Sequence, residues 1–297
     1  RNSSHSGDSS CTIPVHSLPK RTEHRIREIS RTLAEELRVC GLMNVQMAVK
    51  DGEVYILEVN PRASRTAPFV SKATHVSWPA IAAQAMMGRT LDEMGVTEVR
   101  ETGSFAVKES VFPFSKFPGV DVVLGPEMRS TGEVMGLDRS FPVAFAKAQV
   151  SAGNSLPQSG RLIVTVNERD RKTITPMIRR FRDLGFEILA TRGTRDSLKA
   201  LGVPSQLVYK VGEGRPDIVD HIVTGDIALL INTPLGKKSQ HDDYAIRRAA
   251  IRYKVPYLTT MSATSAACDA LIAMRSRVQE VRSIQERIAS LSTTVGA

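Results

Sequence analysis

A carboxylate, an amide oxygen and two guanidinium groups follow one another closely at the end of one apolar run. Glu58 and Asn60 are two positions apart, and side chains alternate along a β-strand, so both should face the same side. Pro61 cannot donate to a sheet ladder and should end the strand, after which Arg62 and Arg65 leave on a turn. Such oxygen ligands suit a hard cation such as Mg²⁺, and arginine forks bind planar oxyanions. The alternative is a strand end with solvated polar side chains.

A second alternating run precedes this strand, and Asp51-Gly52 between the two runs predicts a β-hairpin. With a two-residue loop, Gln46 would lie opposite Leu57 and face away from Glu58. A three-residue loop with a bulge at Gly52 would instead pair Gln46 with Glu58. We predict the second register because it brings the oxygen-bearing side chains together.

Several motifs resemble known ligases. Gln46, followed by Glu58-Val59-Asn60-Pro61-Arg62, resembles the metal-binding hairpin of ATP-grasp ligases. Residues 5–9 (HSGDS), 69–74 (FVSKAT) and 124–136 (LGPEMRSTGEVMG) resemble the large subunit of carbamoyl-phosphate synthetase, in that family's order and spacing. The similarity runs over nearly the whole chain.

The resemblance implies a fragment with two domains. Large subunits of that family carry two ATP-grasp halves and a terminal regulatory domain. We therefore expect an α/β chain in which residues 1–150 form the C-terminal part of an ATP-grasp α+β domain. Residues 151–297 should form a doubly wound, methylglyoxal-synthase-like allosteric domain. The lysine and arginine that hold the nucleotide phosphates in the family would lie upstream, so this fragment alone should be inactive.

The same resemblance assigns catalytic roles by position. Ligands for Mg²⁺ or Mn²⁺ would be Gln46, Glu58 and Asn60. The carbamate or phosphoryl oxyanion would be held by Arg62 and Arg65. ATP would contact His5, Ser6, Gln46 and Glu58. The implied reaction is the ATP-dependent phosphorylation of carbamate, formed from bicarbonate, to carbamoyl phosphate for pyrimidine and arginine biosynthesis, with a glutamine amidotransferase small subunit as partner.

The elements around these residues can be placed by periodicity. In the first half we expect helices over residues 20–40, 78–87 and 141–150 and a strand over 104–112. Residues 151–159 are small and polar and read as a linker. Beyond them we expect strands at 162–166, 186–190, 207–211, 227–231 and 256–258, a helix ending near 184, and helices beginning at 216, 243 and 262. Repeated β-α units with apolar strands predict a parallel sheet covered on both faces.

Polar residues follow three of these strands, at the edge where ligands of such sheets bind. A glycine turn at a helix N-terminus with hydroxyls and a lysine makes an anion site. The region resembles the methylglyoxal-synthase-like domain of the same large subunits, which can bind a nucleotide monophosphate. Matching positions are Thr165, Thr191, Thr194, Lys210, Asn232 and Thr233. The basic residue near the first strand is either Arg171 or Lys172, and Pro234 replaces a hydroxyl residue, which leaves the effector open.

The resemblance also implies an ornithine-type effector site. Its matching positions are Asp8, Glu109, Tyr257 and Thr259. The alternative for Tyr257 is a buried strand aromatic with a satisfied hydroxyl. An apolar stripe near the end predicts a terminal helix through Val278, Val281, Ile284, Ile288 and Leu291.

Composition limits the classes of partner. The net charge of +9 comes from dispersed basic residues, and aromatics make up only 5%, so we expect no nucleic-acid partner. No apolar run approaches the ~20 residues that cross a bilayer. Three widely spaced cysteines are expected to be free thiols in a reducing compartment, the cytoplasm or a plant plastid stroma.

Two other functions stay open. One is an isolated regulatory nucleotide-binding module without catalysis. The other is a stand-alone sugar-phosphate lyase of the methylglyoxal-synthase type, with Asp217 as its base. The oligomeric state is also open and includes a homo-oligomer.

Overall fold

The computed structural model describes most of the chain as two compact units. The described residues are 6–96, 102–114, 116–117, 122, 124–125, 127–233, 237–276 and 280–287, with only the backbone described for residues 6 and 237–242. One unit comprises Arg1–Ser9, Glu109–Gly136 and Pro142–Gln279, and the other comprises Ser10–Lys108, Leu137–Phe141 and Glu280–Ala297. Among the helices of the described residues, none is long and apolar enough to cross a membrane.

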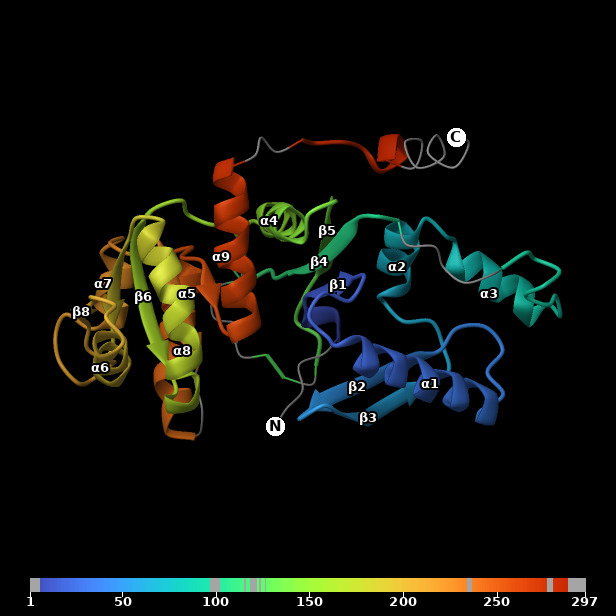
Figure 1. Ribbon diagram of the computed structural model, residues 1–297, viewed down its shortest axis with the longest axis horizontal. Helices are drawn as coiled ribbons and strands as arrows, with labels where there is room; N and C mark the ends of the chain where they lie inside the picture. The colour runs from blue at the N-terminus through green and yellow to red at the C-terminus, as the bar shows by residue number, and fades with distance from the viewer. Residues whose placement is uncertain are drawn as a thin grey trace. The chain divides into compact units, whose positions relative to one another are not determined.

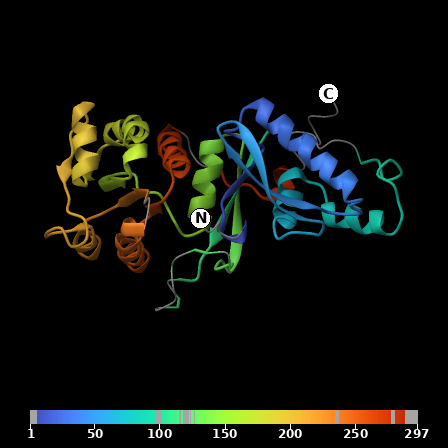
Figure 2. The ribbon, with the colours of Figure 1, turned by 90° about the horizontal axis from the view of Figure 1, so that it is seen from below.

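A two-stranded hairpin and three helices form most of the second of these units. Their bounds are α1 Lys20–Glu36, β2 Asn44–Lys50, β3 Glu53–Asn60, α2 Ala67–Thr74 and α3 Trp78–Met86. Strands β2 and β3 pair antiparallel, and α1 lies along the hairpin (Figures 1 and 2). The predicted first-half helices and the hairpin are therefore present, while α2 was not expected.

A three-stranded sheet has the order β1-β4-β5. Its strands are β1 Cys11–Ile13, β4 Phe105–Val111 and β5 Gly132–Asp138, preceded by the short 3-10 helix η1 Ser6–Asp8. Helix α4 Phe141–Ser151 packs on β5 so closely that a Cβ on Gly136 would overlap the carbonyl oxygen of Ala144 and lie 2.5 Å from the nitrogen of Ala148. The strand therefore needs a residue without a side chain at this crossing.

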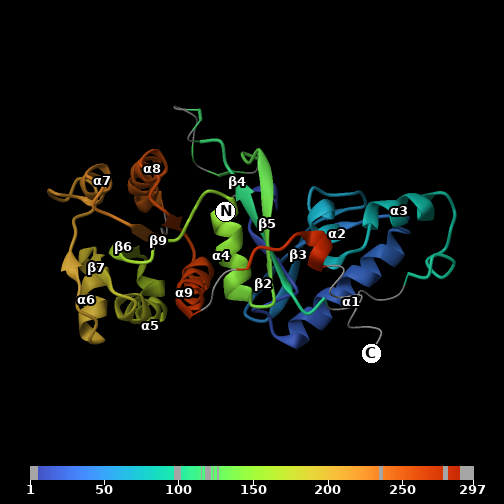
Figure 3. The ribbon, with the colours of Figure 1, turned by 90° about the horizontal axis from the view of Figure 1, so that it is seen from above.

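The other unit contains a five-stranded parallel sheet of order β10-β9-β6-β7-β8. Its strands are β6 Gly160–Val166, β7 Phe186–Ala190, β8 Gln206–Leu207, β9 Leu229–Thr233 and β10 Tyr257–Leu258. Its helical elements are η2 Glu168–Asp170, α5 Arg171–Asp183, α6 Arg192–Ala200, α7 Ile218–Val223, α8 Lys237–Arg252 and α9 Met261–Ser276. Figure 3 shows α7 and α8 on one side of the sheet and α5 and α6 on the other, which is the predicted doubly wound α/β fold.

Alternation along the buried strands explains the two helical layers. Ile163 and Leu230 pack in one cluster with Ile222 of α7 and Ile246 of α8. Their strand neighbours, such as Leu162, face the opposite side and are also fully buried. Strands buried on both faces read as continuous apolar runs, which is why the sequence identified them.

Some boundaries differ from the predictions. Strand β8 ends at Leu207 instead of residue 211, α8 begins at residue 237 instead of 243, and β9 covers 229–233 instead of 227–231. Register with β6 extends β9 through Asn232 and Thr233, whose polar side chains are buried with hydrogen-bond partners. Helix α6 was not predicted, because its first turn contains Gly and Thr, which resemble a loop. Of the predicted terminal helix, residues 284–287 form one turn, whereas residues 280–283 are not helical, so the prediction is wrong at the exposed Val281. Val278, Ile288 and Leu291 lie outside the described residues.

Candidate functional site

Gln46 lies directly opposite Glu58 in the hairpin, as predicted. The predicted three-residue loop is wrong, however. Lys50 pairs with Glu53, so the loop is Asp51-Gly52, and both residues have positive φ, as a type I′ turn requires. The register shifts between Gln46 and Met47, and the bulge therefore lies deep in the hairpin and not at its turn.

The bulge leaves Leu57 without a directly opposite partner. Met47 pairs with Ile56, and the next position, Gln46, pairs with Glu58. A bulge was expected at Gly52 because glycine tolerates positive φ, but Gly52 lies in the two-residue turn instead. The predicted pairing of Gln46 with Glu58 is still correct, because the bulge deeper in the hairpin produces the same register there.

Four polar side chains share one face at this end of the hairpin. Asn44 lies opposite Asn60, and Gln46 lies opposite Glu58. The Asn60 amide nitrogen donates to Glu58 Oε1 at 2.7 Å. Asn44 was missed, although its position two residues before Gln46 is a signal that it faces the same way.

This donor set fits a hard cation that shares its coordination with phosphate oxygens. Glu58 provides a single carboxylate, and Asn60, whose nitrogen faces Glu58, keeps its carbonyl oxygen for another partner. Mg²⁺ is usually held by one or two carboxylates together with phosphate oxygens. Within the described residues, no three His, Cys, Asp or Glu side chains gather as a metal site.

Both candidate arginines lie on the exposed turn that follows β3. The Arg62 backbone nitrogen donates to the Asn60 carbonyl at 2.8 Å, which makes the turn tight. Its guanidinium donates to the Ala63 carbonyl at 3.1 Å. Arg65 is exposed just before α2. Of the two nucleotide-pocket residues predicted upstream, His5 lies outside the described residues, and only the backbone of Ser6 is described.

Asp8 is buried and acts as a connector between distant segments. Its carboxylate accepts hydrogen bonds from the backbone nitrogens of Arg129, at 2.9 Å, and Ser130, at 2.8 Å. The neighbouring Gly7 carbonyl accepts from the hydroxyls of Ser110 and Ser130. Gly7 and Asp8 thus hold the segment that leads into β5.

The remaining ornithine-type positions are placed on different elements. Glu109 on β4 accepts a hydrogen bond from the Gln149 amide at 2.8 Å. Tyr257 lies on β10, and exposed Thr259 follows it. Together with Asp8, these residues belong to the same compact unit.

Three buried hydroxyls meet at the carboxyl ends of β6 and β7. The Thr191 hydroxyl lies 3.2 Å from that of Thr165 and 3.4 Å from that of Thr194. Thr194 Oγ1 also accepts from the Val166 backbone nitrogen at 3.2 Å. Thr165 is in direct register with Asn232 of β9. Strand order reverses between β6 and β9, and doubly wound sheets bind ligands at such a reversal.

Arg171 reaches this cluster and Lys172 takes another direction. A Cβ placed on Gly193, in the first turn of α6, would lie 2.5 Å from Arg171 Nη2. The guanidinium therefore lies against the N-terminus of α6, where Thr191 is the N-cap residue. Lys172 instead lines a surface groove of about 510 Å³ together with Arg179 and Ser197. The structure thus favours Arg171 as the basic group beside the hydroxyls.

Thr233 and Lys210 differ in how firmly they are held. Thr233 is buried, and its hydroxyl and carbonyl oxygens accept from the side-chain amide of Asn167. Asn167 also accepts from the backbone nitrogens of Arg169 and Asp170 and so caps η2. Asn167 was not predicted, although a polar residue directly after a buried strand is a recognisable signal. Lys210 is exposed beyond the end of β8.

Asn232 and Tyr257, assigned to two different effectors, touch the same carboxylate. The Asn232 amide nitrogen lies 2.9 Å from Asp243 Oδ1 and 2.9 Å from the Tyr257 hydroxyl. The Tyr257 hydroxyl donates to the same Asp243 oxygen at 2.5 Å. Burial, and then the Asp243 carboxylate, raise the pKa of Tyr257, so its hydroxyl stays protonated. Asp243 was not among the predicted residues.

Asp217 has a structural role as a helix cap. Its carboxylate accepts from the Asp220 backbone nitrogen at 3.0 Å, and its own nitrogen donates to the Asp220 carboxylate at 2.9 Å. This reciprocal pair is the capping box of α7. The lyase alternative assigned this carboxylate the role of a base, whereas its observed bonds are those of a cap.

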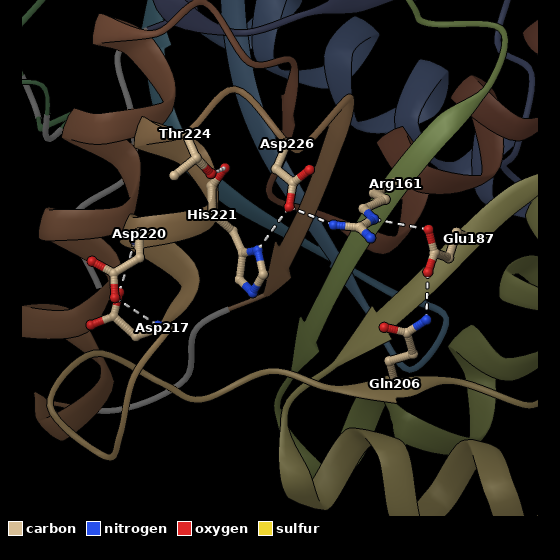
Figure 4. A network of polar contacts seen from close by, with 8 residues as sticks. All are labelled: Arg161, Glu187, Gln206, Asp217, Asp220, His221, Thr224 and Asp226. Atoms are coloured by element: carbon tan, nitrogen blue, oxygen red, sulfur yellow. Dashed lines mark hydrogen bonds and ion pairs between the residues drawn. The ribbon is translucent and has the colours of Figure 1, made fainter.

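A second polar network, unpredicted, lies at the amino ends of the strands. Arg161 at the start of β6 pairs with Glu187 of β7 and with Asp226 before β9 (Figure 4). His221 Nδ1 lies 3.3 Å from the same Asp226 carboxylate. The hydrogen bond and charge of Glu187, with the charge of Asp226, raise the pKa of Arg161. These contacts link the amino ends of β6 and β7 and the segment before β9, at the edge of the sheet opposite to the hydroxyl cluster.

Two family models match parts of the chain. Residues 1–94 match the ATP binding domain of the carbamoyl-phosphate synthase L chain, and residues 173–259 match the MGS-like domain. The first segment contains the hairpin, and the second contains Thr191, Thr194, Asn232 and Tyr257.

Curated relatives extend this similarity across nearly the whole sequence. The carbamoyl phosphate synthase large chain of Archaeoglobus fulgidus is 51% identical over 283 residues, covering 95% of this chain and 26% of that protein. The large chain of Gemmatimonas aurantiaca is 51% identical over 282 residues, with the same two coverages. A "carbamoyl phosphate synthase large chain, C-terminal section" from Methanopyrus kandleri is 48% identical, covering 90% of this chain and 51% of that one. The chain therefore belongs to the carbamoyl phosphate synthase large-chain family and spans about a quarter of the length of the full-length relatives it matches.

Proposed function

We propose that this chain works as part of a carbamoyl phosphate synthase large chain, in which its hairpin forms one wall of an ATP site for the phosphorylation of carbamate. The pairing of Gln46 with Glu58, inside the segment that matches an ATP binding domain, supports this most directly. Residues 1–150 would contribute to the ATP-grasp domain, and residues 151–297 would form the regulatory domain. The product, carbamoyl phosphate, would supply pyrimidine and arginine biosynthesis in the cytoplasm.

The roles of the residues follow from their chemistry. A divalent cation, Mg²⁺ or Mn²⁺, would neutralise charge on the transferring phosphoryl group when bound. Glu58, Gln46 and Asn60 would hold it. Arg62 and Arg65 would bind the planar carbamate or phosphoryl oxyanion through paired N–H donors, which orients it for transfer. Further ATP contacts would come from His5 and Ser6, and the longer protein would work with a glutamine amidotransferase small subunit.

The decisive experiment replaces Glu58 in the intact large chain assembled with its small subunit. We expect Glu58→Gln to lower carbamoyl phosphate formation from ammonia by about 10²-fold or more, because it removes the one carboxylate of the set. Glu53→Gln is the matched control, since Glu53 is exposed on the same strand, at the turn. Activity that survives Glu58→Gln, with ATP held at saturation, would refute the assignment.

We also propose that the MGS-like domain binds a nucleotide monophosphate effector at the hydroxyl cluster. The support is that Thr165, Thr191 and Thr194 meet beside the N-terminus of α6 and the Arg171 guanidinium. Hydroxyls, free helix N–H groups and a guanidinium are the groups that hold a phosphate. Lys210, Asn232 and Thr233 would contact the remainder of the effector.

Calorimetry with UMP and IMP tests this effector site in the intact chain. Arg171→Met should weaken binding by about tenfold or more, in line with the loss of a charge-assisted hydrogen bond. Lys172→Met is the control, because Lys172 lines the separate groove. Equal affinities of the two variants would contradict the proposed phosphate position.

An ornithine-type effector would use Asp8, Glu109, Tyr257 and Thr259. Their membership of one compact unit supports this grouping. Asp8 already accepts backbone hydrogen bonds, so it would contribute its remaining lone pairs and its charge. Titration of the intact protein with ornithine, against Glu109→Gln, tests the site.

A further inference from the structure

We infer that the Asp243 carboxylate couples the two effector sites, because it holds Asn232 and Tyr257 on one oxygen atom. This inference rests on the proposed function, in which Asn232 serves a nucleotide effector and Tyr257 an ornithine-type effector. It adds Asp243 as a positioning residue for both sites.

The three polar groups form a closed triangle. Asn232 Nδ2 lies 2.9 Å from Asp243 Oδ1 and 2.9 Å from the Tyr257 hydroxyl, and that hydroxyl lies 2.5 Å from Asp243 Oδ1. They come from three elements, β9, α8 and β10. Neither Asn232 nor Tyr257 can turn toward its own ligand without changing the bond that the other makes.

The carboxylate fixes which atoms take part. A carboxylate accepts hydrogen bonds only, so the nitrogen of Asn232, not its oxygen, must face Asp243. Tyr257 has one hydroxyl proton, which it donates in a hydrogen bond to Asp243. Toward any further group, the Tyr257 hydroxyl can therefore only accept. Burial favours this arrangement, because it disfavours the ionised tyrosine and raises its pKa.

Arg247 supports the same carboxylate from its other side. Its Nη2 donates to Asp243 Oδ2 at 3.2 Å, one helical turn away on α8. The Arg247 guanidinium carbon also lies 5.7 Å from the centre of the Tyr257 ring. The carboxylate is thus oriented through both oxygens, and Asn232 and Asp243 are each less than a tenth exposed. At such buried positions an unpaired donor or acceptor is costly, so replacing one member of the triangle changes the bonds of the other two.

The coupling is measured by a binding cycle on the intact large chain with its small subunit. UMP and ornithine are titrated separately and then each in the presence of the other. We expect each ligand to change the affinity of the other by the same factor, about fivefold or more. Asp243→Leu should bring that factor to within about twofold of unity, and Asp243→Asn, which keeps one acceptor oxygen, should retain part of it.

Asp269→Leu is the control, since Asp269 pairs with Arg180 on the surface of the same unit. It should leave the coupling factor unchanged. A wild-type factor of one, or a factor that survives Asp243→Leu, would overturn the inference.

A ligand-free measurement separates this inference from the proposed function. In NMR spectra, Tyr257→Phe should shift the side-chain amide signals of Asn232 by a different amount in an Asp243→Leu background than in the wild type, because the amide and the hydroxyl share one Asp243 oxygen. If UMP or ornithine fails to bind while this dependence is present, the proposed effector site is wrong and the triangle stands. If the dependence is absent, the inference is wrong even where both ligands bind.

Discussion

Thr165 and Asn232 lie side by side in register at the carboxyl ends of β6 and β9, where the strand order of the sheet reverses. Thr165 connects to the hydroxyl cluster at α6, and Asn232 connects to Asp243 and Tyr257. One pair of neighbouring residues therefore joins the hydroxyl cluster to a second polar group. The topology explains this arrangement, because the crevice of a doubly wound sheet opens at the carboxyl ends of the two strands between which the strand order reverses.

Gly193→Ala is expected to weaken binding of a phosphate-bearing effector by about tenfold. The added methyl group would lie 2.5 Å from Arg171 Nη2 and 2.9 Å from its Cζ, so the guanidinium must move away from the helix N-terminus. Fold stability should change little, because the displaced group is the end of a flexible side chain. Calorimetry with UMP measures the loss.

Gly132→Ala serves as the control for that change. Nothing lies within 4 Å of a Cβ at Gly132, so it should leave UMP affinity unaltered. If Gly193→Ala binds UMP as tightly as Gly132→Ala does, Arg171 does not hold the phosphate.

Gly136→Ala tests the close packing of β5 on α4. Its methyl group would overlap the Ala144 carbonyl oxygen and lie 2.5 Å from the Ala148 nitrogen. These are backbone atoms of α4, which cannot move without displacing the helix. We expect the free energy of unfolding of this unit to fall by about 3 kcal/mol, as for overpacked cores. Urea denaturation followed by circular dichroism measures it. A loss no larger than that of Gly132→Ala would mean that the helix and strand are farther apart.

Asp8→Asn separates a structural role from an effector role. The carboxylate accepts from the Arg129 and Ser130 backbone nitrogens in a buried position, and an amide can keep only part of that set. We expect a loss of about 2 kcal/mol in unfolding free energy, in the range for a buried donor left without its partner. An unchanged stability with loss of ornithine binding would instead make Asp8 purely a ligand. Thermal and urea unfolding, with ornithine titration, distinguish the two.

The sequence was sufficient for local features that repeat. Pro61 located the end of β3, and the continuous apolar strands predicted the parallel sheet, because a strand whose two faces are both covered by helices buries every one of its side chains. The Gln46–Glu58 pairing was predicted from its chemistry, although the bulge that produces it was misplaced.

The remaining features depend on distant partners. Asp243 looks like one more charge on a helix, and only the folded sheet brings it to Asn232 and Tyr257. Arg171 and Lys172 are neighbours in sequence, and the geometry of α5 directs one to Gly193 and the other to a groove. Helix α6 escaped prediction because the anchoring contact of its buried Leu198 is tertiary, while its first residues resemble a turn.

Cys268 and Cys40 should differ strongly in reactivity. Cys268 is fully buried in α9, and burial raises the pKa of its thiol to about 11, whereas Cys40 is exposed. The thiolate is the reactive form, so at pH 8 Cys268 is almost entirely in the unreactive thiol form, and it is also screened from reagent. Iodoacetamide labelling followed by peptide mass spectrometry should modify Cys40 first, and Cys268 only after urea is added. Equal labelling rates in the native protein would show that α9 opens at this position.

The raised pKa of Cys268 also makes stability depend on pH. Because the folded pKa lies above the value of an unfolded thiol, about 8.5, the contribution of Cys268 to stability is complete below that pH and is lost as the pH rises toward 11. Cys268→Ala should therefore flatten the fall of unfolding free energy between about pH 8.5 and 11, which urea denaturation at several pH values measures. An equally steep fall in Cys268→Ala would show that another group causes it.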